Sequence, residues 1–129
     1  MTFNEKISLA LLSALNHLNK SISALKRGDE NAFSNDVWHV AAELEYALFL
    51  FSLMLGEGRS VPASKLNPDP KNLPTEAIML RVRELIEEAQ GFLKVGSLSN
   101  ALRSTYLARH YLFKVQEGLS GKKHGVGRK

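Results

Sequence analysis

Apolar residues recur at steps of three and four along four stretches of the chain, which is the spacing of one face of an α-helix. The stretches cover residues 3–27, 30–55, 75–95 and 98–118. Their core-facing stripes are, in order, Ile7, Leu11, Ala14, Leu18, Ile22 and Leu25; Phe33, Val37, Val40, Leu44, Ala47, Phe51 and Leu55; Ile78, Val82, Leu85, Ala89 and Phe92; and Leu98, Ala101, Thr105, Ala108, Leu112, Val115 and Leu119. The pattern predicts an all-α fold, a four-helix bundle made of two long helical hairpins.

The expected helix ends carry capping residues. Thr2 followed by Glu5 is a capping-box pattern, in which the hydroxyl and the carboxylate each accept a backbone N–H of the first turn. Asp29 is the expected N-cap of the second helix, and Ser97 or Ser99 that of the fourth. Glycines, which readily adopt the left-handed conformation that ends a helix, follow three of the stretches: Gly28, Gly56 and Gly96.

Residues 56–74 separate the two hairpins and hold all four prolines of the chain. Because a proline disfavours helix at the residue before it, the NPDP segment at 67–70 is not helical in its middle. A connection this long in a small domain is either functional or a crossover, and we favour the crossover because it joins two hairpins and contains no histidine. We expect one helical-bundle domain over residues 1–119, with hairpins 3–55 and 75–119, and a flexible basic tail over 120–129.

The turns of the two hairpins resemble each other. The segment LKRG ends the first helix at residue 28 and LKVG ends the third at residue 96, and Asn-Ala with a large apolar residue follows soon after each. Duplication of one helical hairpin would explain the likeness. The alternative is that any two hairpins need a similar glycine ending and polar start.

The composition excludes several kinds of functional site. The 129 residues are 44% hydrophobic and 23% charged, as in an ordinary globular domain. The absence of cysteine excludes disulfides, thiolate metal ligands and cysteine nucleophiles, and agrees with the reducing cytoplasm, where we expect the protein to be. The first residues lack the basic-then-apolar order of a signal peptide. The sequence also has no phosphate-binding glycine loop and no serine-nucleophile motif.

The net charge of +4 comes from the C-terminal tail. Residues 120–129 carry four basic residues and no acidic one: Lys122, Lys123, Arg128 and Lys129. Without them the chain has 13 basic and 13 acidic residues, so the composition does not support a basic domain face for nucleic acid. We expect at most weak, non-specific nucleic-acid contact through these four side chains.

Residues 46–55 are apolar on nearly every face of the expected second helix. Such a helix has to be covered on all sides, whereas a bundle covers only its inner side. The run is shorter than the ~20 residues that cross a bilayer, so we expect no membrane span. A second copy of the chain is the economical cover, and Phe49, Leu50 and Leu53, off the main stripe, are the candidate dimer-interface residues. The alternative cover is the 56–74 segment.

One pattern of metal-ligating residue types occurs. Asp36 and His39 form an Asp-x-x-His on the second helix, with Glu43 one turn further along. Carboxylate-bridged di-metal bundles need two such motifs and two further carboxylates, and no other histidine has an acidic residue three positions before it. We therefore expect no bound metal and no cofactor, and we interpret the three residues as a polar face with a His39–Glu43 pair.

Arg103 and His110 lie seven residues apart on the expected fourth helix, opposite its apolar stripe, in the segment RSTYLARH. The segment resembles the Arg-x(4–6)-His motif of the HEPN superfamily of small α-helical bundles, many of which are RNases whose Arg and His act at a dimer interface. The KRGD ending at 26–29 and the AAEL core at 41–44 are also HEPN-like. Ser104 stands where the family has a polar residue after the arginine. The resemblance implies an RNase or nucleic-acid-binding module with Arg103 and His110 as catalytic residues.

The second hairpin also resembles one in a family of small archaeal helical proteins of unknown function. The matching positions are Ala89, Phe92, Leu93, Gly96, Asn100, Ala101, Tyr106 and Ala108. This resemblance implies no activity. Taking the residues together, we expect a non-enzymatic binding or scaffold protein that acts as a homodimer and could hold a protein partner, with the HEPN-like module as the alternative.

Overall fold

The computed structural model describes residues 2–55 and 73–127, and the side chains of 2–55 and 73–119. Within these ranges it contains four helices and no strand: α1 (Phe3–Arg27), α2 (Glu30–Leu55), α3 (Thr75–Lys94) and α4 (Leu98–Gly127). The helices pack as a four-helix bundle, which confirms the all-α fold expected from the spacing of apolar residues. The bounds of α1 and α2 are those that the sequence predicts, and α3 ends one residue earlier.

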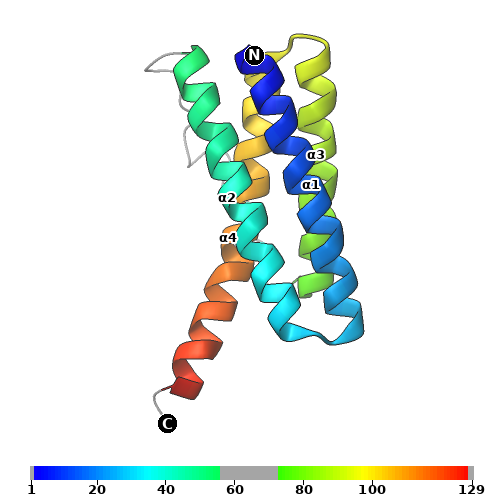
Figure 1. The fold of residues 1–129 in the computed structure, drawn as a ribbon, viewed down its shortest axis with the longest axis vertical. Coiled ribbons are helices and arrows are strands. Elements are labelled where there is room, and N and C mark those ends of the chain that lie inside the picture. Colours follow the sequence, from blue (N-terminus) through cyan, green and yellow to red (C-terminus); the bar gives the residue numbers. More distant parts are fainter. Residues whose placement is uncertain (1, 56–72, 128–129) are drawn as a thin grey trace.

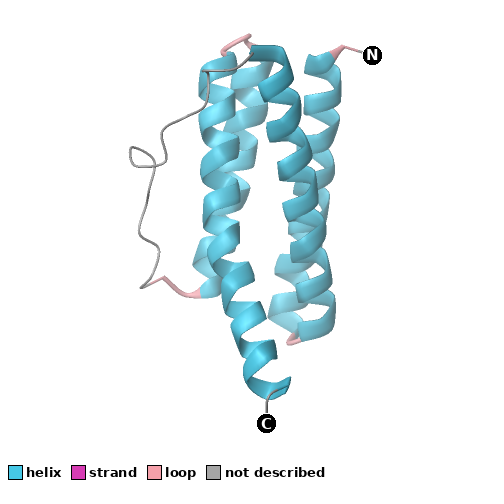
Figure 2. Ribbon diagram, turned by 90° about the vertical axis from the view of Figure 1, so that its left-hand side faces the viewer, coloured by secondary structure: helices cyan, strands magenta, loops and turns pink. Residues whose placement is uncertain are grey.

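Neighbouring helices of the bundle run antiparallel (Figure 1). α1 packs against α2 and α3, and α4 packs against the same two helices, so α1 lies diagonal to α4 and α2 diagonal to α3. α2 ends and α3 begins at opposite ends of the bundle (Figures 1 and 2). This arrangement agrees with a crossover between the two hairpins. Residues 56–72 of that predicted linker lie outside the part of the chain that the structure describes.

Both hairpin turns close with the same backbone motif. Gly28 and Gly96 have φ of 76° and 78°, the left-handed conformation that a side chain disfavours. Asp29 and Ser97, the residues after these glycines, each donate a backbone N–H to the carbonyl five residues back, at 2.9 Å. These bonds satisfy carbonyls that the helix ends would otherwise leave open. The predicted glycine endings of α1 and α3 are therefore confirmed.

The predicted N-caps of α1 and α2 are also present. The Thr2 hydroxyl accepts from the backbone N–H of Glu5, and the Glu5 carboxylate accepts from the backbone N–H of Thr2 at 2.9 Å. The Asp29 carboxylate accepts from the backbone N–H of Ala32 at 3.1 Å. These two caps fix where the chain enters each helix of the first hairpin.

The two hairpins bury corresponding positions, counted from their turn glycines. Buried residues of α2 lie 5, 9, 12, 16 and 19 positions after Gly28, and buried residues of α4 lie at the same distances after Gly96. Positions 7, 10, 14, 17 and 18 before each glycine are likewise buried in both α1 and α3. This shared register supports duplication of one hairpin. The Asn-Ala likeness does not, because Asn31 lies three residues after its glycine and Asn100 four.

α4 continues past the end expected from the sequence. The glycines placed its end near Gly118, with a flexible tail over 120–129, but the helix runs to Gly127. Each glycine costs about 1 kcal/mol of helix propensity relative to alanine without blocking helical hydrogen bonds, and no proline interrupts the segment. The predicted end of the fourth helix near Gly118 is therefore wrong, because residues 119–127 continue it. The last turns of α4 extend beyond the α1–α2 turn (Figure 1).

Candidate protein interface

The outward side of α2 carries a second apolar stripe, separate from the one in the core. Trp38, Tyr46, Phe49 and Leu53 are 51%, 46%, 57% and 52% exposed, and the small Ala42 lies exposed between the first two. From Trp38 to Leu53 these residues follow one another at steps of four, four, three and four, which places them along one side of the helix. α2 is therefore apolar on two sides, one packed in the bundle and one exposed.

Leu50 does not belong to the exposed stripe. It is 3% exposed and lies in the core. Leu50 follows Asp36 and Glu43 at intervals of seven residues, and both of those side chains contact α1, so all three lie on the side of α2 that faces α1. The prediction of Leu50 as a dimer-interface residue is therefore wrong, whereas Phe49 and Leu53 are exposed as that prediction requires.

The start of α1 also carries exposed apolar side chains. Phe3, Leu9 and Leu12 are each about half exposed. Phe3 and Leu12 are nine residues apart, which places them on opposite sides of α1, so these three side chains do not extend the α2 stripe as one surface. We call the exposed stripe the α2 apolar face: Trp38, Tyr46, Phe49 and Leu53.

The carboxylates that border the stripe are held by other helices. α2 contains no lysine or arginine. Glu45 accepts a hydrogen bond from the guanidinium of Arg109 on α4, and Glu43 accepts one from the Ser13 hydroxyl on α1 at 2.9 Å. These two carboxylates thus bond to helices on either side of the exposed stripe, and Glu45 stays exposed in its ion pair with Arg109.

A pair of histidines borders the face on its α1 side. The rings of His17 and His39 stack with centroids 4.7 Å apart and planes inclined by 16°. Asp36 Oδ1 lies 3.7 Å from His17 Nδ1, close enough for an ion pair but too far for a hydrogen bond. That Nδ1 is buried without a hydrogen-bond partner. Because His39 stacks on His17 and Glu43 bonds Ser13, the predicted His39–Glu43 pair is wrong.

The stacked rings are poorly arranged to share a metal ion. An imidazole nitrogen binds a metal through a lone pair in the plane of the ring, and two nearly parallel stacked rings do not aim these lone pairs at a common point. Across residues 2–55 and 73–119, no group of three or more histidine, aspartate and glutamate side chains has the geometry of a metal site.

Arg103 and His110, the residues of the HEPN-like motif, have different surroundings. Arg103 is exposed, whereas His110 is half-buried and its Nε2 is buried without a hydrogen-bond partner. Ser104, between them, is 4% exposed and donates to Glu88 of α3 at 3.4 Å. Arg103 therefore points outward as expected, whereas the Nε2 atom of His110 does not. Ser104, the polar residue after the arginine, links α4 to α3.

Glu88 also belongs to an ionic network on α3. Arg81 lies 3.0 Å from Glu84 and 3.7 Å from Glu88. The hydrogen bond to Glu84, with the negative charge of Glu88, raises the pKa of Arg81 further above its ordinary value. An arginine is already charged at neutral pH, so this network stabilises the α3–α4 side and supplies no group for proton transfer.

Comparisons of the chain with protein-family models, with curated proteins and with solved structures found no match.

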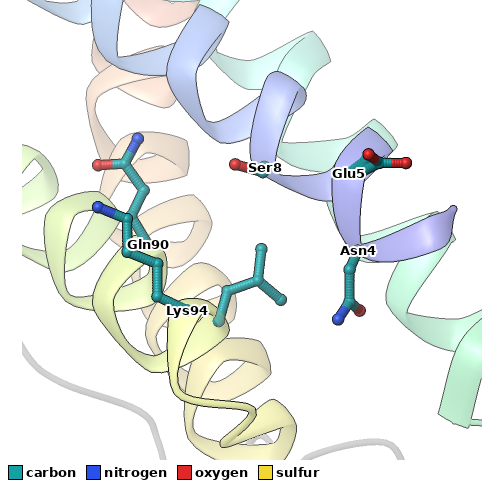
Figure 3. A pocket seen from close by; sticks show the side chains of 6 residues that line it. Asn4, Glu5, Ser8, Gln90 and Lys94 are labelled. Atoms are coloured by element: carbon teal, nitrogen blue, oxygen red, sulfur yellow. The ribbon is translucent and has the colours of Figure 1, made fainter. Parts of the chain in front are cut away.

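Among the described residues, a cavity opens at each end of the bundle. One, of ≈280 Å³, lies between the start of α1 and the end of α3 and has a mixed polar lining: Asn4, Glu5, Ser8, Gln90, Leu93 and Lys94 (Figure 3). Its one carboxylate, on Glu5, points away from Gln90 and Lys94 (Figure 3) and is engaged in the α1 cap. The other, of ≈340 Å³, lies at the end where α2 and α3 begin and has a mainly apolar lining.

By length and composition α2 would also pass as a membrane-spanning helix. The core helix of a soluble protein passes the same test. In this bundle its inner side packs against α1 and α4, and its carboxylates bond to those helices. The exposed apolar residues of α2 form its second stripe.

The sequence predicted half of the α2 apolar face. Phe49 and Leu53 follow from the apolar run at 46–55, whereas Trp38 and Tyr46 did not enter that prediction. Their signal is present in the sequence, because with Ala42, Phe49 and Leu53 they follow one another at steps of four and three residues and define a second stripe. The tail candidates Lys122 and Lys123 belong to the extension of α4, and Arg128 and Lys129 lie outside the described residues.

Proposed function

We propose that the protein is a non-enzymatic scaffold that acts as a homodimer, with the α2 apolar face of one copy packed against the same face of a second copy. The observation that supports this most directly is the exposed stripe of α2, in which four large apolar side chains, each about half exposed, share one side of the helix. Monomeric soluble proteins rarely leave a large contiguous apolar surface open to water, and such surfaces mark interaction sites.

A symmetric contact between two copies would bury the α2 apolar face on both partners. A fully enclosed aromatic side chain buries 150–250 Å², so a half-exposed large side chain offers roughly 100 Å² and the four members of the face together offer roughly 400 Å². A standard protein–protein interface buries about 800 Å² on each partner. The face therefore supplies about half of such an interface, and the residues that border the stripe would supply the rest.

The shape and charge of the face also support self-association. Steps of three and four residues place the stripe along one side of α2, where a second helix can pack beside it. The small Ala42 would let the helix backbones approach closely. Trp38 and Tyr46 are the residue types that contribute most to binding at interfaces. Glu43 bonds Ser13 of α1 and Glu45 pairs with Arg109 of α4, so the exposed carboxylate that a second copy would meet beside the stripe already has a counter-charge.

The test is to replace Phe49 and Leu53 together by glutamate and to measure molar mass by light scattering across the micromolar range. Charge in a buried apolar contact is costly, so the wild-type protein should be dimeric and the double variant monomeric. Because both side chains are exposed within one chain, the helical circular dichroism of the variant should not change.

Val95 provides a control, since it is an exposed apolar residue at the end of α3, the helix that lies diagonal to α2. Val95→Glu should leave the dimer intact. A wild-type protein that is monomeric at high micromolar concentration would contradict the proposal, and a dimer lost in Val95→Glu but retained in the double variant would move the interface away from α2.

A further inference from the structure

We infer that the cavity at the end where α2 and α3 begin binds a small carboxylate with an apolar body, of the kind represented by a medium-chain fatty acid. The inference is independent of the proposed dimer. All four helices line this cavity, which has a volume of ≈340 Å³. Small-molecule sites commonly have volumes of 300–1,000 Å³, lie between the helices of bundles and combine an apolar lining with a few polar groups.

The interior of the cavity is apolar. Phe33, Ile78 and Val115 line it from α2, α3 and α4 and are themselves core residues. Leu25, near the end of α1, and Leu119, on α4, are both half-buried and add further apolar walls. Side chains of this kind offer no hydrogen bond to a ligand, so they favour an aliphatic or aromatic body.

Polar groups lie at the margin of the cavity. Lys114 supplies an ammonium group and Thr75 a hydroxyl. The ion pair of Lys114 with Glu117 is 3.7 Å long and exposed on both sides, so it is weak and readily exchanged for a ligand carboxylate. Glu30 also lines the cavity and has an interaction of its own within the chain. The anionic end of the ligand is therefore assigned to the Lys114 side.

Gly118 keeps one side of the cavity open. Gly118 is exposed at the margin of the cavity, and a Cβ atom at this position would meet no other atom within 4 Å. A long side chain therefore fits there without disturbing the core, and we expect it to obstruct the mouth of the cavity. Gly91 gives a matched control, because it is also a helical glycine with open space around its Cβ position but does not line the cavity. Replacing either glycine raises helix propensity equally.

The test is calorimetric titration of the full-length protein with octanoate and with 1-octanol, below the concentrations at which octanoate forms micelles. Octanoate should bind, with NMR shifts at the methyl groups of Ile78 and Val115, and octanol should bind several-fold more weakly. Gly118→Met should weaken octanoate binding about tenfold or more, whereas Gly91→Met should not change it. Lys114→Gln should remove the preference for octanoate over octanol.

Absence of octanoate binding to the wild-type protein would overturn the inference. Equal affinity for the two ligands, or an unchanged octanoate affinity in Lys114→Gln, would overturn the assignment of a carboxylate. Equal weakening by Gly91→Met and Gly118→Met would show that the ligand binds elsewhere.

Discussion

Two leucines on α2 show how closely the core and the exposed face lie at the scale of single residues. Leu50 is buried and Leu53 is half exposed, although they are only three residues apart. Successive helical residues are rotated by about 100°, so these two side chains differ by only about 60° around the helix. Their identity as leucines says nothing about which one faces the core, because the contact with α1 decides it.

We predict that truncating these leucines has very different costs. Leu50→Ala should lower the free energy of unfolding by about 2–5 kcal/mol, because it leaves a cavity in the core. Leu53→Ala should change it by less than about 0.5 kcal/mol, as for an exposed position. Urea denaturation at high dilution, where self-association does not contribute, measures both. Similar losses in the two variants would mean that Leu53 is also enclosed within one chain.

At the scale of helices, four glycines have two different roles. Gly28 and Gly96 end α1 and α3 with a positive φ, whereas Gly91 and Gly118 lie inside α3 and α4 with no atom near the position of a Cβ. The first two are required by the turn geometry. The other two weaken the helices in which they lie.

We predict opposite effects of alanine at these two kinds of position. Gly28→Ala and Gly96→Ala should each lower the free energy of unfolding by about 1–2 kcal/mol, because alanine is strained at positive φ. Gly91→Ala should raise it by up to about 1 kcal/mol through helix propensity. The unfolded-state contribution of a Gly→Ala change is the same in all three, so their difference in thermal or urea denaturation reports the backbone geometry. Stabilisation by Gly28→Ala would contradict the turn geometry.

At the scale of the whole molecule, a charge-balanced bundle carries a basic C-terminal segment. The 13 basic and 13 acidic residues before residue 120 give no net field to attract phosphate, and α4 carries Lys122 and Lys123 past the end of the bundle. The segment contains no aromatic residue on which a base could stack. Any attraction to nucleic acid should therefore be electrostatic.

We predict that nucleic-acid binding, if measured at low salt, is weak, independent of sequence and lost when residues 120–129 are deleted. Four phosphate contacts at most give a slope of log affinity against log salt no steeper than about −4. Helical circular dichroism of the shortened protein checks that the bundle still folds. Salt-resistant binding, or RNA cleavage that is lost in Arg103→Ala or His110→Ala, would instead favour the HEPN-like alternative.

The local pattern of residues was sufficient to predict most of the fold. Capping at Thr2 and Asp29 and the turns at Gly28 and Gly96 depend on hydrogen bonds and backbone angles within a few residues, so they were read directly from the chain. The end of α4 could not be predicted in this way, because a glycine can lie inside a helix or end it. Only the structure shows that the helix continues past Gly118.

The sequence by itself determined the four helices, their inner stripes and the presence of surplus apolar surface on α2, because each depends on spacing along one helix. Only the tertiary structure decided that Leu50 is core, that His39 stacks on His17, and that an apolar cavity opens beside Gly118. These features depend on how one helix is rotated against another. That rotation is fixed by the packing of side chains far apart in the sequence, which a pattern along one helix does not contain.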